Sequence, residues 1–134
     1  TTVLLVDDDR SYRRILEKRA ADIIIVEPLV TGGISETKKI AIMTEAYEIP
    51  FATHDQNGPV SLLVCSHLNI TIPNLFVMES RRHNYRGISG SLLTDLPEIK
   101  DGYIRPLEGP GLGADLKPEL WERKDATVYS IPTK

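Results

Sequence analysis

The chain has 134 residues, with 16 Lys and Arg against 19 Asp and Glu and a formal net charge of -3. This slightly acidic balance is not that of a nucleic-acid-binding or membrane-surface protein, and no apolar run reaches the ~18 residues of a membrane span. A single cysteine, Cys65, excludes an intrachain disulfide and a cysteine-based zinc site. We therefore expect a cytoplasmic protein with neither nucleic-acid nor membrane partners. Because the chain opens on Thr1 without an initiator Met, we expect processing or a piece of a longer protein.

Short apolar runs and helical stretches alternate from the start of the chain. Val3–Val6 predicts a strand, and Ile23–Val26 is apolar on both faces, as a buried parallel strand should be. Between them, apolar and long side chains recur at helical spacing and predict one helical face. Its members are Tyr12, Ile15, Leu16, Arg19 and Ala20.

Gly32-Gly33 indicates a turn before a second helix. Ser35 and Glu36 suit a helix start, and the pattern predicts a helix from about Ile34 to Tyr47. Its predicted buried stripe consists of Ile40, Met43, Thr44 and Tyr47.

A third strand is predicted over Phe51–Thr53 and a fourth over Leu75–Met78. The helix between them runs through Val60–Leu68, with Asn57 as its predicted cap, Pro59 in its first turn and Cys65 as a small core side chain. Strands that alternate with helices in this way predict an α/β protein with a parallel sheet.

The pattern changes after residue 79, and residues 80–134 read as an irregular extension. Its predicted elements are a helical patch at Ser91–Leu96, a short strand at Tyr103–Arg105, a loop at Gly109–Gly113, a helical turn at Pro118–Arg123 and a terminal strand at Thr127–Ile131.

Three polar residues directly follow predicted strands. Glu27, His54 and Glu79 are 27 and 25 residues apart (54 − 27 and 79 − 54), which is about one βα unit each. Because the carboxyl ends of parallel strands share one edge, these side chains should gather on one face. Any one of them alone is more often a solvated loop or capping residue. His67 and His83 have no comparable context, and we assign them no role.

A carboxylate beside an imidazole fixes its tautomer and makes the ring a general base. A second carboxyl group can donate a hydrogen bond to charge that develops on a substrate. Glu27 and His54 suit the first arrangement and Glu79 the second, while Asp55 is a candidate for orientation or substrate contact.

Several segments together resemble the enolase superfamily, and within it the mandelate racemase group and its galactonate dehydratase-like sugar-acid dehydratases. The resemblance covers roughly residues 13–120. It rests on Ala21-Asp22-Ile23-Ile24, Gly32-Gly33-Ile34-Ser35-Glu36, Ala52-Thr53-His54-Asp55 with Gly58-Pro59-Val60, Ile72-Pro73-Asn74, Leu96 to Tyr103 and Glu108 to Gly113.

The resemblance implies the C-terminal part of a (β/α) TIM-type barrel, with residues 1–79 as its βα units. Residues 80–134 would be a C-terminal extension that packs on the barrel or on a capping region. Since a complete barrel takes ~250 residues, the edge strands must be covered by the remaining part of the barrel, from the same protein or a second chain. We also expect a homo-oligomer.

The implied activity is that of a Mg²⁺-dependent sugar-acid dehydratase, which abstracts a proton α to a carboxylate and then expels water; racemisation is a related outcome. The resemblance places His54 at the dyad histidine, as general base or acid, with Glu27 orienting it. It places Glu79 at the glutamate after the final barrel strand, where it would hydrogen-bond the substrate, a small-molecule sugar acid. Asp55 stays a candidate substrate contact because it lies beside His54.

The sequence departs from the family pattern at two positions. Glu27 stands where the dyad carboxylate is ordinarily Asp, and Leu4 stands where a metal-binding Glu is expected. We therefore expect the magnesium ligands outside this chain and the isolated chain to be inactive. A non-catalytic pseudoenzyme or barrel fragment is the alternative that these departures favour.

A third reading comes from Val3-Leu4-Leu5-Val6-Asp7-Asp8-Asp9, which looks like the start of a phospho-receiver domain, with Asp55 as the phosphate acceptor. The strand before Asp55 is less apolar than that fold requires. Residues 1–19 could also be foreign to the rest, as in a fusion.

Overall fold

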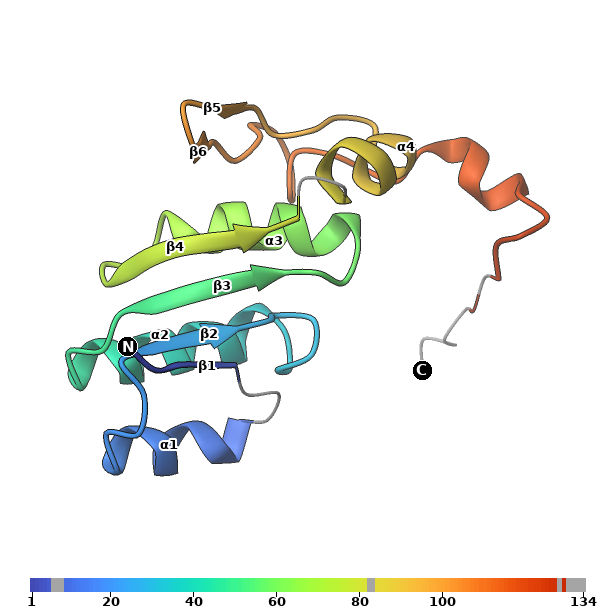
Figure 1. Ribbon diagram of the computed structural model, residues 1–134. Helices are drawn as coiled ribbons and strands as arrows, with labels where there is room; N and C mark the ends of the chain where they lie inside the picture. Colours follow the sequence, from blue (N-terminus) through green and yellow to red (C-terminus); the bar gives the residue numbers. More distant parts are fainter. Residues whose placement is uncertain (6–8, 82–83, 128, 130–134) are drawn as a thin grey trace.

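Four parallel strands form one sheet in the order β1-β2-β3-β4, which confirms the predicted strand series (Figure 1). The computed structural model describes residues 1–5, 9–81, 84–127 and 129. Neighbouring strands pair in parallel along the whole series. The strands are β1 (Val3–Leu5), β2 (Ile23–Val26), β3 (Phe51–Asp55) and β4 (Leu75–Ser80).

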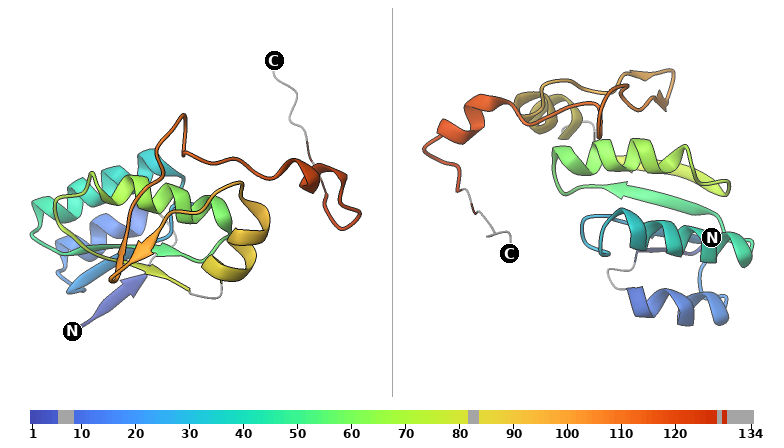
Figure 2. Two further views of the ribbon diagram at one scale, coloured as in Figure 1. Left: turned by 90° about the horizontal axis from the view of Figure 1, so that it is seen from above. Right: turned by 180° about the vertical axis from the view of Figure 1, so that it is seen from behind.

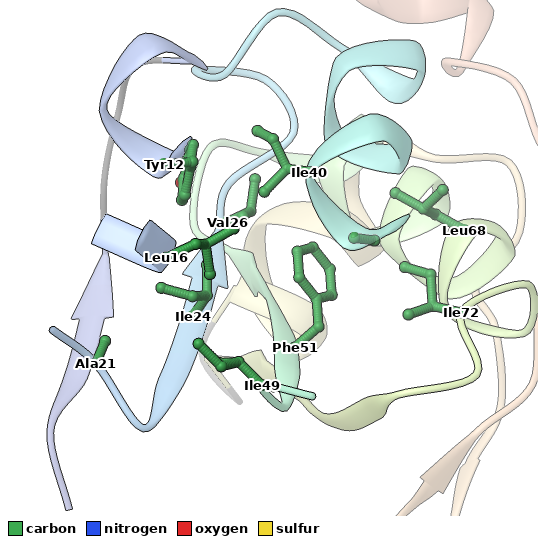
Figure 3. Packing of buried hydrophobic residues seen from close by; sticks show 11 residues of the cluster. Tyr12, Leu16, Ala21, Ile24, Val26, Ile40, Ile49, Phe51, Leu68 and Ile72 are labelled. Carbon is green, nitrogen blue, oxygen red and sulfur yellow. The ribbon is translucent and has the colours of Figure 1, made fainter. Parts of the chain in front are cut away.

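Three helices connect these strands and lie on one face of the sheet (Figure 2). They are α1 (Asp9–Glu17), α2 (Ile34–Ala46) and α3 (Pro59–Asn69). The core lies between helices and sheet, where Phe51 packs with residues of β2, α1 and α2 (Figure 3). Its fully buried members include Tyr12, Leu16, Ile24, Val26 and Phe51.

Within α2 the predicted stripe is only partly buried. Ile40 and Thr44 are buried, whereas Met43 and Tyr47 are partly buried against the core. Thr37 and Ala41 complete the buried face. Cys65 is fully buried in α3, as predicted.

Helices α2 and α3 begin at Ile34 and Pro59, as predicted, but a glycine rather than a polar side chain caps each of them. Gly33 and Gly58 are the N-caps of α2 and α3, and neither helix has a side-chain cap hydrogen bond in the described part of the chain. The capping prediction for Asn57 is therefore wrong. The C-terminal end of α1 also differs from the prediction. The helix ends at Glu17 and Arg19 has a φ of 47°, so Arg19 and Ala20, which the pattern placed on the helical face, lie beyond the helix and are exposed.

Strands β3 and β4 each run two residues further than predicted, so His54 and Glu79 lie within strands and not after them. The pairing of β3 with β4 also contains an irregularity. Phe51 pairs with Leu75, whereas Ala52 pairs with Val77. One residue of β4, Phe76, is thus inserted as a bulge, and every later pair is shifted by one position.

The chain after β4 is mostly irregular, and it carries short elements that the sequence only partly predicts. A π-helix (Asn84–Ser89) leads into α4 (Gly90–Leu92), so the helical segment lies earlier than the predicted patch. A 3₁₀ helix (Pro118–Glu122) confirms the predicted turn. The predicted strand at Thr127–Ile131 falls largely outside the described residues, as do Val6, Asp7 and Asp8.

A two-stranded hairpin, β5 (Ile99–Lys100) and β6 (Tyr103–Ile104), was only half predicted. Its turn residues Asp101 and Gly102 have φ angles of 51° and 81°. Asp-Gly is a strong hairpin signal, because both positions tolerate the left-handed conformation. The Asp-Gly pair between Lys100 and Tyr103 therefore indicates a strand on each side of the turn, including β5, which was not predicted from the sequence.

The outer strands β1 and β4 leave apolar side chains exposed. Val3, Phe76 and Val77 are 50, 64 and 47% exposed. Side chains of this kind on edge strands favour a further layer of protein over them. Among the described residues, no helix has the length and apolar character needed to cross a bilayer.

Candidate functional site

Glu27, His54 and Glu79 meet at the carboxyl edge of the sheet, as their spacing predicts. The His54 Nδ1 atom lies 3.7 Å from Glu27 Oε2, and the His54 Nε2 atom lies 3.9 Å from Glu79 Oε2. These are ion-pair distances, longer than hydrogen bonds. The imidazole is thus placed between two carboxylates, one at each ring nitrogen.

The bulge in β4 is what brings Glu79 to His54. The two residues are direct partners in the β3–β4 ladder. With the register that begins at Phe51 and Leu75, His54 would instead pair with Met78. Because side chains alternate between the faces of a strand, the Glu79 side chain would then lie on the opposite face from His54.

Burial differs sharply across this group. Glu27 and His54 are only 2 and 8% exposed, whereas the Glu79 side chain is 57% exposed. The buried pair therefore has fixed surroundings, and Glu79 stands on the open side. A ligand that reached the sheet edge would meet Glu79 and the Nε2 side of the ring first.

Glu27 follows β2, and its carboxylate is held by the segment that joins β3 to α3. Oε2 accepts a hydrogen bond from the backbone N–H of Gln56 at 2.9 Å, and Oε1 accepts one from Ser61 Oγ at 2.8 Å. Ser61 lies in the first turn of α3, so the carboxylate is at the positive end of that helix. These interactions compensate for the burial of the Glu27 charge.

Asp55 lies one residue beyond His54 on β3, and alternation places it on the face that α3 covers. It is 1% exposed, and its Oδ2 accepts a hydrogen bond from Ser80 Oγ at 2.7 Å. Burial raises the pKa of Asp55 above its usual range, the Ser80 hydroxyl opposes this, and the nearby Glu27 charge adds to it. Contact of Asp55 with a substrate stays a prediction.

An imidazole with a buried carboxylate near one nitrogen and an exposed carboxylate near the other has the groups that proton transfer uses. Side chains of Ala52 and His54 share their face of the sheet with Val77 and Glu79. This face carries no helix in Figure 2.

Sequence reasoning missed Ser61 and Ser80, whose hydroxyl groups bind the two buried carboxylates. Ser80 directly follows Glu79, and a polar residue there at a strand end was a usable signal. For Ser61 the only signal was a small polar residue in a first helical turn. His67 contacts the backbone oxygen of Leu112 through Nε2 at 3.1 Å, away from the group, and His83 lies outside the described residues.

The described residues do not bring together a metal site. No group of three or more His, Cys, Asp or Glu side chains among them is arranged to hold a metal ion. Leu4, at the position where the resemblance expects a metal-binding Glu, packs against the core. By themselves, the described residues therefore do not fit a bound magnesium ion.

Relatives with curated names match most of the chain. D-galactonate dehydratase from Cronobacter sakazakii is 36% identical over 87% of this chain and 36% of its own length. The D-galactonate dehydratase from Ralstonia pickettii is 33% identical over 81% of this chain and 30% of its own length. The chain thus spans about a third of the length of these relatives.

Solved structures agree with the fold. An enolase of the mandelate racemase subgroup from Agrobacterium tumefaciens, with a succinimide residue, has a TM-score of 0.76 and 38% identity over 86% of this chain and 30% of its own. A member of the enolase superfamily from Salmonella Typhimurium has a TM-score of 0.78 and 30% identity over 83% of this chain and 28% of its own. The four strands and their helices are therefore the C-terminal portion of a TIM-type barrel.

The family model for enolase C-terminal domain-like proteins matches residues 6–120. That span contains β2 to β4, α1 to α3 and all three residues of the carboxyl-edge group. This chain therefore belongs to the enolase superfamily, as a member of its enolase C-terminal domain-like family.

Proposed function

We propose that the protein to which this chain contributes is a Mg²⁺-dependent sugar-acid dehydratase. It removes a proton α to a carboxylate of a small sugar acid and then releases water. The observation that carries the proposal is the placement of His54 between Glu27 and Glu79 at the carboxyl edge of a parallel sheet. The relatives named as D-galactonate dehydratases support the substrate class.

Each residue has a distinct part in this proposal. His54 Nε2, on the open side, takes the proton as general base or returns one as general acid. Glu27, buried and held by two donors, orients the ring through Nδ1. Glu79, the exposed member, hydrogen-bonds the substrate carboxylate or the charge that develops beside it.

Magnesium enters the proposal through the family and not through residues seen here. When bound, the ion would stabilise negative charge on the substrate carboxylate. We place its ligands in a part of the protein outside the described residues.

The remainder of the barrel is the partner that this proposal requires, from the same protein or from a second chain. The exposed apolar side chains of β1 and β4 support such a cover, because they would otherwise face water. We propose a cytoplasmic homo-oligomer and an isolated chain without activity.

The test uses the complete protein, incubated with Mg²⁺ and a panel of sugar acids that includes D-galactonate. Dehydration yields a 2-keto-3-deoxy acid, which semicarbazide converts to an absorbing product. Replacing His54 with Asn should lower kcat by ~10²-fold or more, whereas the matched His67→Asn variant should stay within about twofold because His67 lies away from the group. Unchanged turnover in the His54 variant would remove the proposed role.

Racemisation is separated from dehydration by a second readout on the same samples. Solvent deuterium that enters the substrate at the α carbon without keto-acid formation indicates proton transfer alone. Keto-acid formation indicates loss of water.

A non-catalytic barrel protein is the second candidate, favoured by Leu4 at the position of a metal-binding Glu and by the longer Glu27 carboxylate at the dyad position. It predicts neither turnover nor Mg²⁺ binding by the complete protein, as measured by calorimetry. The phospho-receiver reading is weakened because Asp55 is buried and bonded to Ser80. Phosphoryl transfer from acetyl phosphate to Asp55 would restore it.

A further inference from the structure

The carboxylate of Glu27 is fixed by two donors that both come from the segment around the start of α3. Ser61 Oγ binds Oε1 at 2.8 Å and the Gln56 N–H binds Oε2 at 2.9 Å. A third and weaker contact joins the Leu29 N–H to Oε1 at 3.4 Å. Glu27 and Ser61 are 2 and 0% exposed, so these contacts are shielded from competing water.

Of the two short hydrogen bonds, only the one from Ser61 depends on a side chain. The Gln56 N–H is a backbone group and is present whatever residue occupies the position. A Glu side chain has three rotatable bonds, one more than Asp, and therefore needs more anchoring to hold a single orientation. The Ser61 hydroxyl supplies that anchoring at Oε1.

The other oxygen of the same carboxylate faces the histidine. Glu27 Oε2 is the atom that lies 3.7 Å from His54 Nδ1. Because the two oxygens are rigidly joined, a contact that fixes Oε1 also fixes Oε2.

From this geometry we infer that Ser61 is a positioning residue, whose hydroxyl sets the orientation of Glu27 and, through it, the distance to His54 Nδ1. The inference rests on the proposed function, in which His54 transfers the proton. Ser61 explains how the longer glutamate can occupy the dyad position with a defined carboxylate.

The test follows His54 directly in the complete protein. The hydrogen on the imidazole Cε1 exchanges with D₂O at a rate that depends on ring protonation, and mass spectrometry of the His54 peptide gives the midpoint pH of that curve. The charged or titratable groups around the ring are Glu27, Glu79 and the adjacent Asp55, which lies on the other face of β3. Glu79 and Asp55 are not substituted in any variant. Because the Ser61 hydroxyl also hydrogen-bonds the Asp55 carboxyl, the Glu27→Gln background is needed to show that an effect of Ser61 passes through Glu27.

Replacing Ser61 with Ala frees Oε1, so that the carboxylate can turn toward His54 Nδ1 and stabilise the protonated ring. Closing the distance from 3.7 Å to ~2.8 Å should raise the midpoint by ~1 pH unit at an effective dielectric constant of ~20. In a Glu27→Gln background the same substitution should shift the midpoint by less than ~0.2 pH unit, because the charge through which Ser61 acts is gone.

Ser66→Ala is the matched control. Ser66 is a buried serine of the same helix, 1% exposed, whose hydroxyl binds the Leu63 backbone oxygen at 2.8 Å. Its replacement should leave the midpoint unchanged. Ser61→Cys keeps nearly the same volume with a weak donor and should raise the midpoint in the same direction, which keeps the test available if Ser61→Ala does not fold.

An unchanged or lowered midpoint in the Ser61 variants, or an equal shift in the Glu27→Gln background, overturns the inference. Measurement of turnover distinguishes a failure of this inference from a failure of the proposed function. If the midpoint shifts but the wild-type protein has no turnover, the dehydratase proposal is wrong and the inference about Ser61, Glu27 and His54 is retained. If turnover depends on His54 but the midpoint does not shift, the dehydratase proposal is retained and the inference about Ser61 is wrong.

Discussion

Replacing Glu27 with alanine tests how strongly its carboxylate connects β2 to the start of α3. In the structure that carboxylate accepts a hydrogen bond from Ser61 Oγ at 2.8 Å and from the Gln56 N–H at 2.9 Å. Hydrogen bonds to a charged group contribute about 1.5–3 kcal/mol each. Because Gln56 is exposed to water, we use the lower end for each bond and expect a loss of about 3 kcal/mol in the free energy of unfolding.

The measurement is urea unfolding of the purified protein followed by far-ultraviolet circular dichroism, with linear extrapolation to zero urea. Glu17→Ala is the control. Glu17 pairs with Arg13 on the surface of α1, with both side chains well exposed, so its loss should cost about 0.5 kcal/mol or less. If Glu27→Ala is no more destabilising than Glu17→Ala, the carboxylate does not hold these elements together.

Three further predictions follow from burial and close packing. Because burial raises the pKa of Asp55 above the usual 3.8, the folded state binds its proton more tightly, and this contribution to stability is lost as pH rises through the folded pKa. The free energy of unfolding of the Asp55→Asn variant should therefore rise relative to that of the wild-type protein as pH increases through this range. Urea unfolding at a series of pH values measures the difference, and a difference that does not change with pH would contradict the prediction. Burial raises the pKa of Cys65 to about 12, so native protein should resist iodoacetamide at pH 8 and react once unfolded; rapid native alkylation would count against the buried placement. Gly113→Ala would place a Cβ 2.5 Å from the Leu107 Cβ at a φ of 79°. We expect thermal unfolding to show a loss of about 2 kcal/mol in the free energy of unfolding. Gly111→Ala is the control, because its Cβ would have open space while its positive φ gives similar backbone strain.

The alternation of apolar runs with helical periodicity predicts the sheet well, because both signals are local. The run at Ile23–Val26 matches β2 residue for residue. The starts of α2 and α3 were also predicted at the right residues, Ile34 and Pro59, but their caps were not, since the glycine caps Gly33 and Gly58 carry no polar side chain. The capping role expected of Asn57 is absent for that reason.

In the candidate site, the sequence predicts which residues reach the same edge of the sheet, but not the contacts that they make there. Spacing along the chain determined that Glu27, His54 and Glu79 would reach one edge, because parallel strands end together. Adjacency to His54 suggested Asp55 as a further candidate, and strand alternation places it on the α3 side of the sheet, beside Ser80 and near the Glu27 charge.

By itself, the sequence determined the order of strands and helices, the parallel sheet and the edge at which polar side chains gather. Only the tertiary structure decided that Glu79 faces His54, because the bulge at Phe76 shifts the β4 register by one residue. Only the tertiary structure decided that Glu27 is anchored by Ser61, 34 residues away along the chain. Both results depend on pairing and packing between segments that are distant in sequence, and local propensity carries no record of such contacts.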